Sequence, residues 1–160
     1  MTAVLLSGLV MGTLATVMMD IWAQILTRTA GVPAPNWAMV GRWVGHMPRG
    51  QFTHTNMADA NQVPGERPIG WVFHYAVGLV YGIALATLMG PDWLAAPTFA
   101  PAWIFAILTI GFGWLVMQPG MGLGLAASQT PAPWRARALG LLAHTVFGIG
   151  LWLGALVHMH

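Results

Sequence analysis

The chain has 160 residues, of which 57% are apolar and only 6% are charged. An ordinary soluble domain carries roughly a quarter of charged residues, so four acids and six bases could not cover the surface of a soluble fold of this size. The mean hydropathy of +0.67 agrees, and the composition predicts an integral membrane protein of one domain. Cysteine is absent and the bases are all arginine, which excludes thiolate chemistry and does not favour nucleic-acid binding.

Four apolar runs are long enough to cross a bilayer core, which takes about 20 helical residues. They cover residues 3–26, 69–89, 101–127 and 138–157 and predict an all-α, four-helix membrane bundle. Gly90-Pro91 ends the second run, and Pro119 is expected to kink the third. No basic residue precedes the first run, so we expect it to remain as a transmembrane helix and not to be removed as a signal peptide.

The arginines predict the orientation of the chain. All of them fall in the segments that join the first run to the second and the third to the fourth. By the positive-inside rule both segments are cytoplasmic and both termini are periplasmic. Five of these arginines are also candidates to bind anionic lipid headgroups: Arg42, Arg49, Arg67, Arg135 and Arg137.

The long loop at residues 27–68 is expected to contain a short amphipathic helix at about 36–47, lying in the membrane interface. The apolar residues that recur at helical spacing are Trp37, Val40, Val44 and Met47. The polar residues expected off this stripe are Asn36, Arg42 and His46. His46 and His54 are expected to be solvated and receive no role, and Glu66 is expected to neutralise its neighbour Arg67.

The chain contains an internal repeat of the form R-x2-G-x3-H-x3-G. It begins at Arg67 with His74 as its histidine, and again at Arg137 with His144. The repeat predicts two tandem helical hairpins. At 1.5 Å per residue, Asp20, His74 and His144 all lie about 8–9 Å from the cytoplasmic ends of their helices, so they are expected to form one polar layer. Gln118 joins this layer if the third helix continues past Pro119.

Short segments along nearly the whole chain resemble a bacterial inner-membrane family called domain of unknown function 2938. The more specific ones are His46-Met-Pro-Arg-Gly50 and Met117-Gln-Pro119. The others are Gly12-Thr13, Met19-Asp20, Val40-Gly-Arg-Trp43, Pro64-Gly-Glu-Arg67, Gly70-Trp71, His74-Tyr75 and Ser128-Gln-Thr-Pro131. The resemblance implies a small multi-pass protein of the bacterial cytoplasmic membrane, and it brings no catalytic residue with it.

Three functional hypotheses follow from the polar layer. Asp20, His74, Gln118 and His144 could bind and relay a proton or a small ion, because ionisable groups inside a bilayer are functional candidates by default. Alternatively, His74 and His144, each flanked by glycines, could ligate haem b for electron transfer. In the third reading these residues are interhelical hydrogen-bonding groups in a structural or assembly protein.

Further features give weaker indications. Met117 and Met121 have the spacing of thioether ligands for copper, although methionine mostly fills gaps between helices. Neither serine lies in a nucleophile-elbow pattern, so the sequence favours a non-enzymatic role. Gly-x3-Gly pairs beginning at Gly8, Gly78 and Gly150 predict close helix packing, in part between the subunits of a homodimer. The expected partner of the whole chain is the lipid bilayer.

Overall fold

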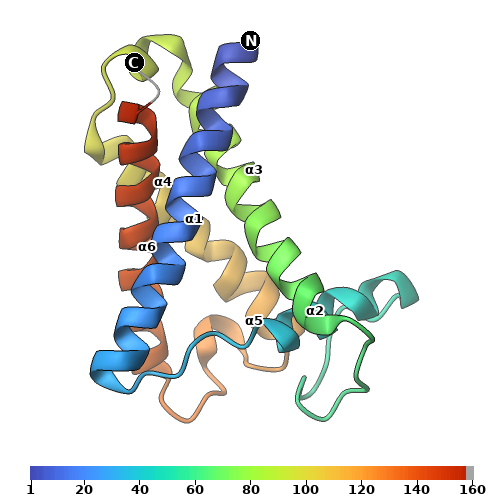
Figure 1. Ribbon diagram of the computed structural model, residues 1–160. Helices are drawn as coiled ribbons and strands as arrows, with labels where there is room; N and C mark the ends of the chain where they lie inside the picture. The colour runs from blue at the N-terminus through green and yellow to red at the C-terminus, as the bar shows by residue number, and fades with distance from the viewer. Residues whose placement is uncertain (158–160) are drawn as a thin grey trace. The chain divides into compact units, whose positions relative to one another are not determined.

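The computed structural model of the protein describes residues 1–157, and within them every regular element is helical and no strand occurs. Four helical segments are long and apolar enough to cross a membrane (Figure 1). These are α1 (Thr2–Ala30), α3 (Glu66–Ala95), the run Phe99–Gly120 and α6 (Pro133–Val157). The all-helical class and the four apolar helices predicted from the sequence are confirmed.

Helix ends follow local backbone chemistry. α1 stops at Gly31, which adopts the left-handed conformation (φ 63°) and donates its N–H to Leu26. α3 is broken inside its span at Gly90 (φ 73°), and Pro91 begins the turns that reach Ala95. The helix therefore extends beyond the expected end at residue 89, after a change of direction that only glycine makes easily.

The run Phe99–Gly120 consists of α4 (Phe99–Phe112), a π-helical turn η2 (Gly113–Met117) and α5 (Gln118–Gly120). The expected continuation to residue 127 is wrong, because the helix ends at Gly120. Gly122 and Gly124 have positive φ, and the Leu123 N–H turns back to donate to the Gln118 carbonyl at 2.8 Å. A short 3₁₀ helix, η3 (Leu125–Ala127), follows.

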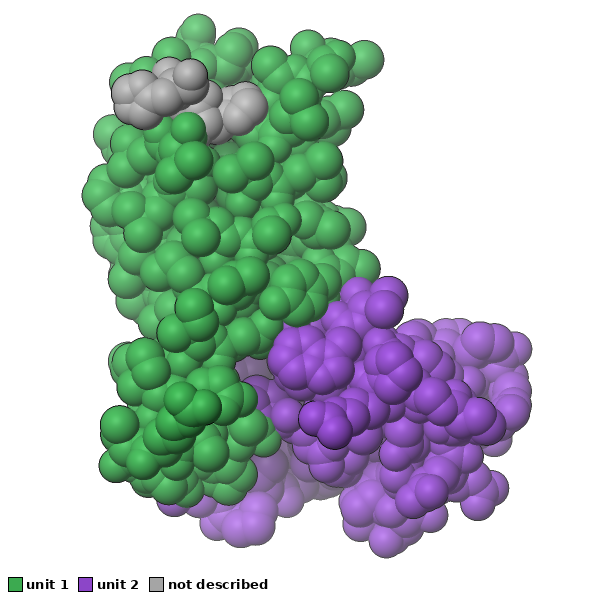
Figure 2. Space-filling view, viewed as in Figure 1, with its two compact units in different colours: residues 1–34, 75–109, 141–160 green, residues 35–74, 110–140 purple. Residues whose placement is uncertain are grey.

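The chain forms two compact units, shown in different colours in Figure 2. Unit 1 comprises residues 1–34, 75–109 and 141–160, and unit 2 comprises residues 35–74 and 110–140. Three of the four unit boundaries fall inside α3, α4 and α6, so α3 passes from unit 2 into unit 1 between His74 and Tyr75.

The core of unit 1 relies on small residues that let helix backbones approach closely. A Cβ at Gly12 of α1 would lie 2.5 Å from the carbonyl oxygen of Gly78 in α3, and one at Gly154 of α6 would lie 2.6 Å from the Cα of Met11. All three Gly-x3-Gly pairs pack against helices of the same chain in this way. The sequence had assigned some of these faces to a homodimer, whereas the structure uses them within one chain.

Unit 2 is built around α2 (Trp37–His46), capped by the side chain of Asn36, and η1 (Met47–Arg49). Its hydrophobic cluster is formed by the buried residues Val40, Trp43, Met57 and Met121. Gly41 of α2 and Gly70 of α3 leave no room for a side chain, since a Cβ at either one would overlap the carbonyl of the facing helix. The expected amphipathic helix is present, and its glycine face packs against α3.

Candidate functional site

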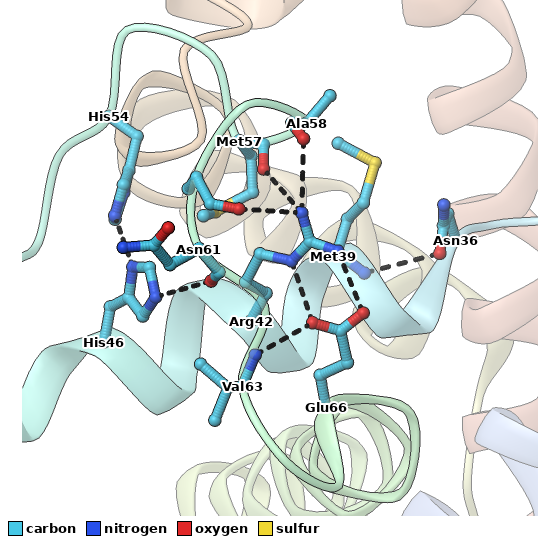
Figure 3. A network of polar contacts seen from close by, with 11 residues as sticks. Asn36, Met39, Arg42, His46, His54, Met57, Ala58, Asn61, Val63 and Glu66 are labelled. Atoms are coloured by element: carbon cyan, nitrogen blue, oxygen red, sulfur yellow. Dashed lines mark hydrogen bonds and ion pairs between the residues drawn. The ribbon is translucent and has the colours of Figure 1, made fainter.

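The densest polar network in unit 2 centres on Arg42 of α2 (Figure 3). Its Nε donates to Oε2 of Glu66 at 2.8 Å and its Nη2 donates to Oε1 at 3.0 Å. Its Nη1 reaches three loop carbonyls, those of Met57, Ala58 and Ala60, at 3.1–3.3 Å. One guanidinium thus joins α2, the first residue of α3 and the loop between them.

This arrangement corrects two expectations. Arg42 is 7% exposed, so it contacts protein where a lipid headgroup or a solvated face was expected. Glu66 pairs with Arg42 and not with Arg67, which is exposed. Arg42 can be buried because a bidentate carboxylate and acceptor carbonyls surround its guanidinium. The bond to Glu66 raises the pKa of Arg42 further above its usual value.

A second chain of contacts links His46 and His54 (Figure 3). Nδ1 of His46 lies 2.8 Å from Nε2 of His54, and Nε2 of His46 lies 3.0 Å from the carbonyl oxygen of Asn61. At the other end, Nδ1 of His54 lies 3.3 Å from the carbonyl oxygen of Gly120. His46 is 3% exposed, so the expectation that it is solvated is wrong.

An open pocket of about 510 Å³ adjoins this histidine pair in unit 2. Its walls come from the loop around residue 54, from α5 and from the segment that follows α5. The lining residues are His54, Thr55, Pro119, Gly122, Gly124, Leu125, Ser128 and Gln129. Sequence reasoning did not find this pocket; the signals that pointed there were two motifs of the family resemblance, Met117–Pro119 and Ser128–Pro131, which contribute Pro119, Ser128 and Gln129 to its lining.

In unit 1, the Tyr75 hydroxyl of α3 donates a hydrogen bond to Oδ2 of Asp20 in α1 at 2.9 Å. Both side chains are half-buried. A carboxylate in an apolar helix normally faces a polar neighbour, and the Tyr75 hydroxyl is such a neighbour for Asp20. Tyr75 was not among the predicted site residues, although it follows His74 directly in the sequence.

His144 of α6 also lies in unit 1 and contacts α4. Its Nδ1 is 2.8 Å from the carbonyl oxygen of Ala106 and 3.3 Å from the hydroxyl of Thr109. The Thr109 hydroxyl itself donates to the same carbonyl at 2.7 Å. Because a carbonyl only accepts, the proton of the neutral ring sits on Nδ1 and Nε2 carries the lone pair.

The other two predicted site residues belong to unit 2. The His74 ring stacks on Trp37 of α2 with centroids 4.0 Å apart and planes at 25°. Gln118 follows the π-helical turn, a feature frequent at functional sites. Its Oε1 is buried and has no hydrogen-bond partner in the described part of the chain, which leaves an acceptor available inside the protein.

The remaining candidates are placed as follows. Arg49, Arg67 and Arg135 are exposed, while Arg137 lies over the Trp134 ring and donates from Nε to the Ala126 carbonyl at 2.8 Å. Met121 is buried in the core of unit 2, and Met117 packs against that core. Within residues 1–157, no group of three or more His, Asp or Glu side chains gathers as a metal site. The haem and copper roles stay predictions.

The fold and these contacts define a helical protein with four helices able to cross a membrane and polar side chains on those helices. The model of the family described as "Protein of unknown function (DUF2938)" matches residues 9–158, and the chain belongs to this family. The resemblance drawn from the short motifs is thereby confirmed. No curated protein and no solved structure matches the chain.

Proposed function

We propose that this protein is a multi-pass protein of the bacterial cytoplasmic membrane that relays a proton or a small ion through polar groups on its helices. The observation that carries the proposal is the hydrogen bond between Tyr75 and Asp20, which joins a carboxylate to a phenol within two apolar helices. Inserting a charged carboxylate in a bilayer costs about 2.5–3.5 kcal/mol. Carboxylates in transmembrane helices are therefore rare and commonly have a function.

The charge distribution supports the proposed orientation. Five of the six arginines belong to unit 2, together with two of the four acids. By the positive-inside rule the two Arg-bearing segments that join the helices are cytoplasmic and both termini are periplasmic.

The register of α1 and α6 supports a shared polar level in unit 1. The two helices run antiparallel, since Gly154 meets Met11 and Gly150 meets Ala15. Asp20 lies five residues after Ala15 in α1. Thr145, next to His144, lies five residues before Gly150 in α6. The Asp20 carboxylate and the imidazole of His144 therefore belong to the same level of the helix pair, within a few ångströms of depth at about 1.5 Å per residue.

The chemistry of the two groups suits a relay. Asp20 exists as a carboxylate or as an acid, and Tyr75 can hydrogen-bond to either form. His144 presents Nε2 as a proton acceptor because Nδ1 is committed to the Ala106 carbonyl. In unit 2, His74, which precedes Tyr75 in α3, and Gln118, with its unpartnered oxygen, remain candidates to bind a proton or a small ion.

Proton flux into proteoliposomes tests the proposal. With a pH-sensitive dye inside and a potassium diffusion potential imposed, the wild-type protein should acidify the lumen faster than protein-free vesicles. Asp20→Asn keeps the size of the side chain and removes its titration, and should lower the flux at least about tenfold. Asp92→Asn alters an exposed carboxylate of α3 and is the matched control. Equal flux in Asp20→Asn and wild-type vesicles, or wild-type flux no higher than that of protein-free vesicles, would refute the relay.

The same preparation tests the haem alternative. A histidine with Nδ1–H bonded to a carbonyl offers Nε2 to iron, and His144 has this arrangement. Haem-supplemented protein should then show a Soret band that His144→Ala removes. Protein without a Soret band would exclude haem binding.

A further inference from the structure

The open pocket of unit 2 has walls that backbone hydrogen bonds hold together. The His54 N–H donates to the Gly120 carbonyl at 2.9 Å, and the Met57 N–H donates to the Met121 carbonyl at 3.1 Å. The loop that carries His54 and Thr55 is thereby fixed against the segment after α5. The volume of about 510 Å³ lies in the range of small-molecule sites.

Two glycines of the pocket wall lie where a side chain would clash with the surrounding chain. Gly122 and Gly124 line the pocket with φ of 80° and 72°. A Cβ at Gly122 would overlap the Thr55 carbonyl, and a Cβ at Gly124 would overlap the Ser128 hydroxyl. The chain therefore turns closely beneath the loop, and the polar side chains at positions 54, 55, 128 and 129 surround the remaining space.

The histidine pair that borders the pocket holds an extra proton when all its contacts are made. The carbonyls of Asn61 and Gly120 only accept, so the outer nitrogen of each ring must carry a proton. The contact of 2.8 Å between Nδ1 of His46 and Nε2 of His54 requires a third proton, shared between these two atoms. Three protons on two imidazoles make one neutral ring and one cation, so the complete hydrogen-bond chain carries one positive charge.

The charged neighbours leave this charge available to a ligand. Arg42 of α2 and Glu66 of α3 neutralise each other, although the Glu66 carboxylate also interacts electrostatically with His46. Asp59 of the loop is exposed and bonds to Asn56. The residues that line the pocket include no acid. When the hydrogen-bond chain is complete, an anion in the pocket lies beside a cationic pair and no carboxylate.

We propose that this pocket binds an oxyanion group, a phosphate or a carboxylate, and that binding is coupled to proton uptake by the His46–His54 pair. The Nδ1–H of His54 is the donor that a ligand recruits most readily, because its contact with Gly120 is the longest of the three at 3.3 Å. The hydroxyls of Thr55 and Ser128 and the amide of Gln129 supply neutral donors. The oxyanion belongs either to a free solute or to a lipid headgroup.

Sulfate is the probe, because its charge is constant across the pH range in which histidine titrates. Isothermal calorimetry in nanodiscs of phosphatidylcholine should give tighter binding at about pH 5.5 than at about pH 8, with heats that depend on the buffer as protons are taken up. His54→Gln should remove the pH dependence and lower the affinity about tenfold, the loss expected for one charge-assisted hydrogen bond. Gln62→Ala, an exposed change in the same loop, is the control.

Ser128→Ala is a second test in case His54→Gln fails to fold. Ser128 is exposed, and its substitution removes one donor from the pocket. It should weaken sulfate binding and retain the pH dependence. No sulfate binding at about pH 5.5, or binding that is equal at both pH values, would overturn the proposal. So would unchanged sulfate affinity in both the His54 and the Ser128 variant.

Two further experiments distinguish a lipid headgroup from a free solute, and the oxyanion pocket from the proton relay. Weaker sulfate binding in nanodiscs that contain phosphatidylglycerol would identify the lipid headgroup as the occupant, and equal binding would identify a free solute. Asp20→Asn, which is expected to lower proton flux at least about tenfold, should bind sulfate as the wild-type protein does. Failure of the relay and failure of the oxyanion pocket are therefore distinguishable.

Discussion

Arg42 and Glu66 form a bidentate ion pair, Nε to Oε2 at 2.8 Å and Nη2 to Oε1 at 3.0 Å, that ties α2 to the start of α3. The side chains are 9% and 18% exposed. The remaining guanidinium donors hold the carbonyls of the loop that carries His54. The ion pair therefore positions one wall of the pocket in unit 2 without lining it.

Removing the arginine should strongly destabilise unit 2. Arg42→Ala removes the cation that pairs with the Glu66 carboxylate and the side-chain donor to three loop carbonyls, and the Val63 N–H alone remains as a donor to Glu66. Breaking a buried pair on one side costs about 3–5 kcal/mol. We expect a large drop in the thermal midpoint in detergent. A double-mutant cycle with Glu66→Gln should show strong coupling. Arg49→Ala, which alters an exposed arginine of η1, should have little effect; comparable losses in the two arginine variants would contradict the role assigned to Arg42.

Gly122 should tolerate alanine less well than Gly50. Both glycines have positive φ, 80° and 75°, which costs an L-residue about 1–2 kcal/mol. A Cβ at Gly50 meets nothing within 4 Å, whereas one at Gly122 overlaps the Thr55 carbonyl. Gly50→Ala should show the backbone cost alone, and Gly122→Ala should lose further stability and distort the pocket. Thermal unfolding and sulfate affinity measure the two effects; equal stability of the two variants would show that the loop does not press on Gly122.

Alanine at Gly82 and at Gly111 should have opposite effects. A Cβ at Gly82 of α3 would overlap the Gly8 carbonyl of α1, while one at Gly111 of α4 meets nothing within 4 Å. Gly111→Ala should stabilise the protein by about 0.5–1 kcal/mol through helix propensity. Gly82→Ala should destabilise it by about 1–3 kcal/mol because the helices must separate. A stabilised Gly82→Ala variant would refute the close packing of α1 and α3.

Ala126 should be improved by glycine. It adopts φ 47° and ψ 48°, and its carbonyl accepts the Arg137 side chain at 2.8 Å. Relief of about 1–2 kcal/mol of left-handed strain exceeds the entropic cost of glycine, about 0.5–1 kcal/mol. Ala126→Gly should therefore raise the thermal midpoint slightly. A lower midpoint would mean that the alanine methyl group makes a contact worth more than the strain.

Hydrophobic run length predicted the helical class, because a bilayer-spanning helix satisfies its own backbone and is encoded locally. The observed helix ends differ from the predicted ones where single residues turn the backbone. Pro119 was expected to kink a helix reaching residue 127, yet Gly122 and Gly124 turn the chain back. The spacing of apolar residues in α2 also misplaced Arg42 and His46, whose burial depends on acceptors that the sequence pattern does not reveal.

The sequence by itself determined the apolar, all-helical character of this protein, its family and the presence of ionisable residues in apolar helices. These properties depend on composition, periodicity and short motifs, which are local. Only the tertiary structure decided which partner each polar group has: Glu66 for Arg42, His54 for His46 and Tyr75 for Asp20. The physical reason is that a buried polar group must be satisfied by whatever donors and acceptors the fold brings within about 3 Å. These can lie many residues away along the chain, as Glu66 does from Arg42 and Tyr75 from Asp20.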